Sequence, residues 1–130
     1  TIINDSKSTS FASSVGVLKT STNIHWLLGG LHKKGDKLNL SKKYFNNIKA
    51  YIYGKNKKFF NKKLNKKIKY ENFENLEDAL KKVFMIIRKK NFLNQTILFS
   101  PSAASFDSFK NFEDRGYHFN QLIKKYLNVF

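Results

Sequence analysis

The sequence contains no cysteine and only one proline among its 130 residues. Without cysteine the chain can form neither a disulfide nor a thiolate metal site, which is typical of proteins from a reducing compartment. It also lacks a run of 18 apolar residues and a basic N-terminal segment followed by an apolar one, so neither a membrane span nor a secretory signal is predicted. We therefore expect a cytoplasmic protein with no membrane partner.

Arginine is scarce, since 23 of the 25 basic residues are lysines, and the formal net charge is +16. Most of the excess lies in residues 33–69, which carry 14 lysines against Asp36. Grooves that bind nucleic acids favour arginine, because its planar group forms paired hydrogen bonds with phosphates and bases. We therefore expect a solvated surface and no nucleic-acid partner, with a basic module that binds RNA or DNA through Lys55–Lys69 as an alternative.

The length and composition fit one compact domain. With 41% hydrophobic and 15% aromatic residues the chain can bury a core, and 130 residues leave no room for a second full domain. Because the sequence starts with Thr1 instead of methionine, we expect residues 1–130 to be a single domain of a longer protein.

Short apolar runs of strand length alternate with helical patterns. The clearest helical pattern runs from Leu76 to Ile87, with apolar residues every three or four positions and Asn75 as a cap. Further helices are expected at Phe11–Leu18, Phe59–Leu64 and Phe119–Leu127, and strands at Thr1–Asn4, Ile24–Leu28, Ala50–Tyr53, Lys67–Tyr70 and Thr96–Phe99. The alternation predicts an α/β, Rossmann-like three-layer domain, with a mostly parallel sheet of about five to six strands and helices on both faces.

Ligands of such folds bind beyond the carboxyl ends of the strands, so the loops after the strands are informative. Asn4–Ser10 is densely polar, Leu27–Gly35 contains a glycine pair and two lysines, and Ser100–Asp107 consists mostly of small residues that would open a helix. Taken singly, each could be an ordinary cap or turn. Together, two helix starts, the glycine pair and three lysines (Lys7, Lys33 and Lys34) would converge on one sheet edge and suit an anionic ligand.

Two kinds of site are not predicted within the chain. Neither GxxxxGK[ST] nor GxGxxG occurs, so the domain alone has no complete nucleotide cradle. His25, His32 and His118 lack metal-ligand spacing, and we expect no metal site.

The three loops resemble, in order and spacing, the C-terminal domain of the Mur ligases, of the type that adds D-glutamate to UDP-N-acetylmuramoyl-L-alanine. The matching segments are Ile3–Thr9, Leu27–Gly30 and Phe99–Gly116, and the resemblance covers nearly the whole chain. Sister ligases for other amino acids and the folylpolyglutamate synthetases carry a DYAH-type motif where this chain has Asn4-Asp5-Ser6-Lys7. A Mur-like ligase with another amino-acid substrate is the alternative.

The resemblance implies an ATP-dependent amide ligase of three domains that acts in cytoplasmic peptidoglycan precursor synthesis. The N-terminal domain would bind the UDP-sugar, and the central domain would hold the P-loop, Mg²⁺, a carbamylated lysine and most catalytic groups. The present domain would close over the nucleotide, with Asp5 at the ribose and Lys7 on the phosphate side. Alone, this chain should not catalyse.

The resemblance also implies a D-glutamate site within this domain. Thr9 and Lys33 would hold one carboxylate, Ser105 and the backbone amide of Phe112 would hold the other, and Phe106 would form an apolar wall. Family members have a glycine-rich turn between the glycine pair and the lysine, whereas this chain has Leu31-His32-Lys33-Lys34. The spacing favours Lys33, and Lys34 is the alternative.

An amide of Phe112 that points at a ligand cannot lie inside a continuous helix. We therefore predict a break between Ser105–Lys110 and a helix that resumes around Glu113–Gly116.

Overall fold

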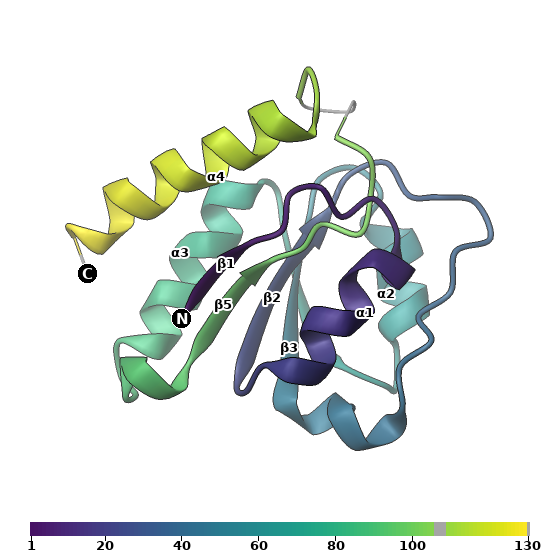
Figure 1. Ribbon diagram of the computed structural model, residues 1–130, viewed down its shortest axis with the longest axis horizontal. Helices are drawn as coiled ribbons and strands as arrows, with labels where there is room; N and C mark the ends of the chain where they lie inside the picture. The colour runs from purple at the N-terminus through teal and green to yellow at the C-terminus, as the bar shows by residue number, and fades with distance from the viewer. Residues whose placement is uncertain (106–108, 130) are drawn as a thin grey trace.

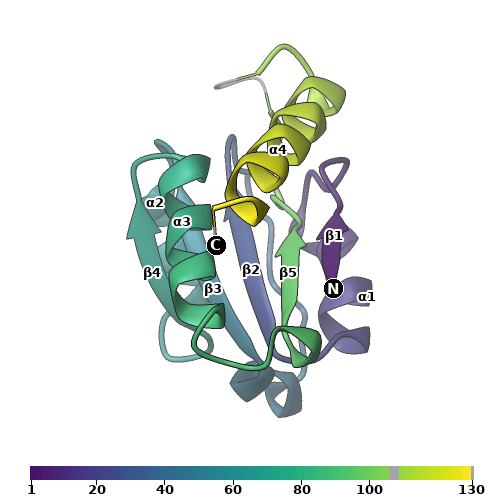
Figure 2. The same ribbon diagram turned by 90° about the vertical axis from the view of Figure 1, so that its left-hand side faces the viewer.

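A computed structural model of the protein describes residues 1–105 and 109–129. Its centre is a five-stranded sheet in the order β1-β5-β2-β3-β4, in which every neighbouring pair is parallel (Figure 2). The strands are β1 (Ile2–Asn4), β2 (Ile24–Gly29), β3 (Ile48–Tyr53), β4 (Lys69–Phe73) and β5 (Thr96–Phe99). The predicted parallel α/β sheet is confirmed.

Helices cover both faces of this sheet, which gives the three predicted layers (Figure 1). One face carries α1 (Phe11–Thr20) and α2 (Lys57–Leu64), and the other carries α3 (Leu76–Ile87) and α4 (Phe112–Leu127). Two short 3-10 helices, η1 (Lys42–Asn47) and η2 (Phe92–Asn94), lie in the connections that lead to β3 and β5. The architecture is Rossmann-like.

The sheet separates two apolar clusters because alternate side chains of each strand point to opposite faces. Trp26 and Leu28 of β2 pack with α1 and α2, whereas Leu27 packs with α3 and α4. The central strand β2 is buried along its whole length. A strand covered on both faces in this way is typical of parallel sheets.

Helix boundaries follow local capping chemistry. The Asn75 side chain accepts a hydrogen bond from the Asp78 N–H, and α3 begins directly after it, as predicted. Ser10 caps α1 through a reciprocal pair of contacts with Ser13.

Some predicted boundaries are wrong. The strand expected at Lys67–Tyr70 runs from Lys69 to Phe73. The last helix, whose apolar pattern was seen from Phe119 onward, begins at Phe112, close to the expected start around Glu113–Gly116. The helix expected to open at the small residues around Ser105 falls largely on residues outside the described ones. Residues 109–111 are not helical and α4 begins at Phe112, which agrees with the predicted break before the helix around Glu113–Gly116. In residues 1–105 and 109–129 no helix has the length and apolar character needed to cross a membrane.

Candidate functional site

The three polar loops that the sequence singles out meet at one edge of the sheet, beyond the carboxyl ends of β1, β2 and β5. Next to the end of β1, the Asp5 N–H donates to the carbonyl oxygen of Phe99 at 2.7 Å. The loop after β2 pairs with the loop after β5, since Leu31 and Ala104 exchange two backbone hydrogen bonds of 3.0 and 2.9 Å. The expected convergence of these loops is confirmed.

The glycine pair permits close contacts within the protein. A Cβ atom on Gly29 would lie 2.2 Å from the carbonyl oxygen of Tyr53, and one on Gly30 would lie 2.6 Å from that of Ala104. The backbone angle φ of Gly30 is +126°, which side chains rarely tolerate. These glycines therefore let the loop approach neighbouring backbone, where the sequence interpretation expected an approach to a ligand.

Asp5 and Lys7, the predicted nucleotide-binding residues, lie two positions apart in the first loop. Asp5 is half-buried, and its Oδ2 accepts a hydrogen bond of 2.8 Å from the Ser100 hydroxyl. Lys7 is exposed. The carboxylate is thus held by the loop after β5, while the ammonium group lies at the surface of the site.

A buried group of hydroxyls lies directly behind Asp5. Ser14 of α1 is at its centre, with Oγ to Oγ distances of 2.6 Å to Ser8, 2.6 Å to Ser100 and 2.7 Å to Ser102. All four residues are buried, and we call them the serine cluster. Because Ser100 also donates to Asp5, the cluster connects α1 with both loops and with the candidate ribose-binding carboxylate.

Thr9 and Lys33 are both exposed and come from different loops. A hydrogen bond links the two segments: the Phe11 N–H donates to Oδ2 of Asp36 at 2.8 Å. Phe11 is the first residue of α1, two positions after Thr9, and Asp36 follows Lys33 by three. The protein's own carboxylate thus occupies the start of α1, where the sequence interpretation expected the helix to face an anionic ligand.

Ser105 and Phe112 lie on either side of the predicted break. Ser105 is buried, next to the paired Leu31 and Ala104. Phe112 is the first residue of α4, so its N–H has no partner in the preceding turn of the helix. The Phe112 carbonyl oxygen accepts a hydrogen bond of 2.6 Å from the Ser6 hydroxyl. Phe106, the predicted apolar wall, lies outside the described residues.

Comparison with curated proteins identifies relatives that align with nearly the whole chain. The UDP-N-acetylmuramoylalanine–D-glutamate ligase of Rickettsia felis is 40% identical over 124 residues, that of the Wolbachia of Brugia malayi 37% over 129, and that of a Hydrogenobaculum species 40% over 129. These alignments cover 95%, 98% and 98% of this chain. No protein-family model matches it. The chain is similar, over nearly its whole length, to one part of these ligases.

The chain spans only about a quarter of the length of these ligases, since the alignments cover 27%, 26% and 30% of the three relatives. The alignments with these ligases agree with the resemblance that the sequence motifs indicated.

One residue that joins the loops of the candidate site was not predicted from the sequence. Arg115 is 1% exposed, and its guanidinium donates to the carbonyl oxygens of Ser6 at 2.5 Å, Ser8 at 3.3 Å and Ala103 at 2.8 Å. Its Nε also donates to the Ser6 hydroxyl at 3.2 Å. Arg115 thus ties the loop of Asp5 to the loop after β5. Arg115 lies inside the Phe99–Gly116 motif, and that position was the one sequence feature that could have singled it out. A buried arginine needs partners such as these carbonyl oxygens.

Lys33 and Lys34 both lie exposed in the loop after β2, and the Lys33 carbonyl oxygen accepts a hydrogen bond of 3.0 Å from the Asp36 N–H. Lys33 and Lys34 thus occupy the first two positions of a tight turn that ends at Asp36. The choice between Lys33 and Lys34 stays a prediction.

A buried histidine lies near the amino end of the central strand β2, at the opposite end of the strand from the site. His25 in β2 contacts the Tyr51 hydroxyl and the Gln95 side-chain oxygen at 2.7 Å each. Burial lowers the pKa of His25, the hydrogen bond with Gln95 opposes this shift, and Lys90 and Lys49 lower the pKa further. The expectation that His25 packs inside the fold is confirmed.

Proposed function

We propose that this chain is the C-terminal domain of an ATP-dependent ligase that adds D-glutamate to UDP-N-acetylmuramoyl-L-alanine in the cytoplasm. The similarity to D-glutamate ligases at 33–40% identity supports the reaction class. The observation that carries the role of this domain is the contact between Asp36 and the Phe11 N–H, which brings the loops of Lys33 and Thr9 to the same sheet edge as Ser105.

A small dicarboxylate needs two separate anion-binding groups. Lys33 and Thr9, from adjoining loops, would bind one carboxylate of D-glutamate through an ammonium group and a hydroxyl. Ser105 and the Phe112 N–H would bind the other, because the first amides of a helix are donors without partners in the helix. Phe106 would then cover the apolar part of the substrate.

The nucleotide side of the site would consist of Asp5 and Lys7. The Asp5 carboxylate would accept hydrogen bonds from the ribose hydroxyls, and its contact with Ser100 fixes its orientation. Lys7 is exposed and can reach the phosphates when this domain closes over ATP held by the central domain.

In the proposed reaction, an oxygen of the substrate's alanyl carboxylate attacks the γ-phosphorus of ATP, and ADP leaves. The amine of D-glutamate then attacks the carbonyl carbon of the acyl phosphate, loses a proton and displaces inorganic phosphate, which leaves an amide bond. The residues of this domain would act by positioning the amine and by balancing the charge of the two carboxylates.

Mg²⁺ would be held mainly by the central domain. Among residues 1–105 and 109–129, no three histidine or acidic side chains gather as a metal site requires. Asp5 and Asp36 each accept a hydrogen bond from the protein and lie in different loops. We therefore assign no metal-binding step to this domain.

The proposed partners of this domain are the N-terminal and central domains of the same enzyme.

Steady-state kinetics of the full-length ligase with Lys33→Ala and Ser105→Ala tests the substrate assignment. Each variant should raise KM for D-glutamate at least tenfold, since a charge-assisted hydrogen bond contributes about 1.5–3 kcal/mol, and KM for the UDP-sugar should change little. Lys34→Ala in the same assay distinguishes the two neighbouring lysines.

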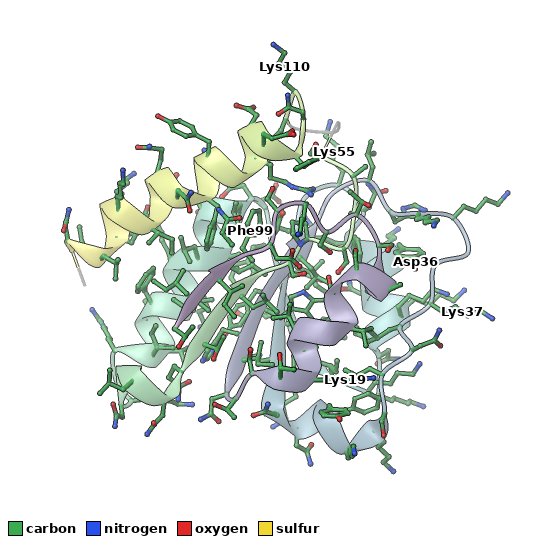
Figure 3. All side chains as sticks on the ribbon, viewed as in Figure 1. Lys19, Asp36, Lys37, Lys55, Phe99 and Lys110 are labelled. Atoms are coloured by element: carbon green, nitrogen blue, oxygen red, sulfur yellow. The ribbon has the colours of Figure 1, made fainter. Side chains whose placement is uncertain are left out.

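Lys19→Ala is the matched control. Lys19 is an exposed lysine in the last turn of α1, at the end of the helix away from the site (Figure 3). A variant set that changes only KM for the UDP-sugar would contradict the assignment. If the full-length enzyme used another amino acid more efficiently than D-glutamate, the proposed substrate would be wrong.

The coding sequence upstream of Thr1 gives an independent test. A P-loop of the form GxxGK[ST] should occur within the preceding few hundred residues. If the upstream region encodes none, the proposed three-domain ligase is wrong.

A further inference from the structure

The turn that carries Lys33 is anchored on both sides by contacts outside the loop. His32 stacks on Phe59 of α2, with ring centroids 4.2 Å apart and an angle of 15° between the ring planes. Asp36 accepts the hydrogen bond of 2.8 Å from the Phe11 N–H. Figure 3 labels Asp36 beside the start of α1. One anchor thus directly precedes Lys33, and the other follows it by three residues.

Both anchors lead to the same buried residue. The Phe11 backbone binds Asp36, and the Phe11 ring lies 6.2 Å from the ring of Phe59, on which His32 stacks. Phe11 is completely buried and also contacts the ring of Trp26 edge to face at 6.3 Å. The turn is therefore attached to the core through two chemically different contacts.

The chain between the anchors has little freedom. The Asp36 N–H donates back to the Lys33 carbonyl oxygen at 3.0 Å, which closes a four-residue turn. Gly35, the third residue of this turn, has φ of +77°, a conformation that favours glycine. On the N-terminal side, Gly30 accepts a hydrogen bond of 3.0 Å from the Asn56 side chain. The backbone of Lys33 therefore has a defined position before any ligand binds.

We propose that His32 and Asp36 are positioning residues that hold Lys33 ready for a carboxylate of D-glutamate, an inference that rests on the proposed function. A lysine on a free loop would lose more conformational entropy on binding than one on a fixed turn. Asp36 has a second effect, because its carboxylate occupies the positive end of α1. The incoming carboxylate is thereby left to the side chains of Lys33 and Thr9.

Kinetics of the full-length ligase tests this role. His32→Ala should raise KM for D-glutamate about two- to tenfold, the range expected for one aromatic contact, with kcat and the KM values for ATP and the UDP-sugar unchanged. His32→Phe keeps a ring against Phe59 and should restore the wild-type KM. Asp36→Asn keeps the shape of the side chain but removes its charge, and should raise the same KM.

Lys37→Ala is the matched control, because Lys37 is an exposed lysine of the same loop (Figure 3). It should leave all KM values unchanged. Wild-type KM for D-glutamate in both His32→Ala and Asp36→Asn would overturn the proposal, as would a failure of His32→Phe to restore it.

Hydrogen exchange of the full-length enzyme separates this proposal from the proposed function. Peptides that contain residues 31–37 should exchange faster in His32→Ala than in the wild type, and peptides from α3 should not change. Unchanged exchange in residues 31–37 would overturn the anchoring. A wild-type enzyme that does not use D-glutamate would overturn the proposed function, whereas the exchange result would still report on the anchor.

Discussion

The Arg115 guanidinium binds both oxygen atoms of Ser6, the hydroxyl through Nε at 3.2 Å and the carbonyl through Nη2 at 2.5 Å. Ser6 in turn donates from its hydroxyl to the carbonyl oxygen of Phe112 at 2.6 Å. The first turn of α4 and the loop after β1 are therefore joined by a closed set of hydrogen bonds. This set fixes the Phe112 amide relative to Asp5, so the two halves of the candidate site share one support.

Replacing Arg115 with lysine should destabilise the domain by about 2–4 kcal/mol, because one ammonium group cannot reproduce a planar set of donors to three buried carbonyl oxygens. Urea unfolding monitored by circular dichroism measures the change. Lys89→Arg, at an exposed position just after α3, is the control and should change the free energy of unfolding by less than about 0.5 kcal/mol. Equal losses in both variants would contradict the role of Arg115.

Ser14→Ala should lower the free energy of unfolding by about 1–3 kcal/mol, the range for a buried hydrogen-bonding group that loses its partner. The change deletes the central hydroxyl of the serine cluster and leaves Ser8, Ser100 and Ser102 each one contact short. The matched control is Ser41→Ala, since Ser41 is exposed and its side chain makes no cap hydrogen bond to η1. A melting temperature equal to that of Ser41→Ala would show that the cluster adds no stability.

Sequence patterns predicted those elements whose signals are local. The prediction of a helix from Leu76 to Ile87 matches both ends of α3, because the apolar stripe and the Asn75 cap indicate the same start. The strand at Lys69–Phe73 was misplaced because it lies at the sheet edge, where none of its residues is fully buried and no clear apolar pattern is required. Local pattern thus predicts an element well where burial and capping coincide.

The candidate site was predicted as a set of loops but without its internal contacts. Asp36 and Phe11 are 25 positions apart, and neither residue type signals such a partner. Arg115 was overlooked because a charged residue near a helix start normally faces solvent, whereas this one is buried among carbonyl oxygens. Contacts of this kind depend on how the chain is brought together by the sheet, which periodicity alone does not encode.

The stability of the domain should fall as the pH is lowered from about 7, because burial holds the pKa of His25 below its ordinary value of 6.5. The unfolded chain binds a proton near that value and the folded chain only at lower pH, so acid favours unfolding in between. Melting temperatures at pH 7.5, 6.5 and 5.5 measure the trend, and His25→Asn should flatten it. NMR titration of the imidazole that gives a pKa at or above 6.5 would contradict this prediction.

Gln95→Leu provides the complementary test of sign. The hydrogen bond that the His25 ring donates to Oε1 of Gln95 raises the pKa of His25, against the effect of burial. Its loss should move the titration of His25 to still lower pH and widen the range in which acid destabilises the domain. An upward move of the titration would mean that Gln95 does not favour the charged ring.

Two glycines should respond in opposite directions to the same substitution. Gly30→Ala should cost about 2 kcal/mol or more, because the new Cβ would lie 2.6 Å from the Ala104 carbonyl oxygen at φ of +126°. Gly16→Ala should stabilise the domain by about 0.5–1 kcal/mol, because a Cβ at this exposed position of α1 meets no atom within 4 Å and alanine favours the helix. Thermal unfolding of both variants measures the difference.

Since Leu31 and Ala104 pair directly beside Gly30, faster hydrogen exchange of the Leu31 amide in Gly30→Ala would place the damage at the junction of the two loops. A Gly30→Ala protein as stable as the wild type would show that these loops can separate without loss, and the close approach at the centre of the site would then have no energetic role.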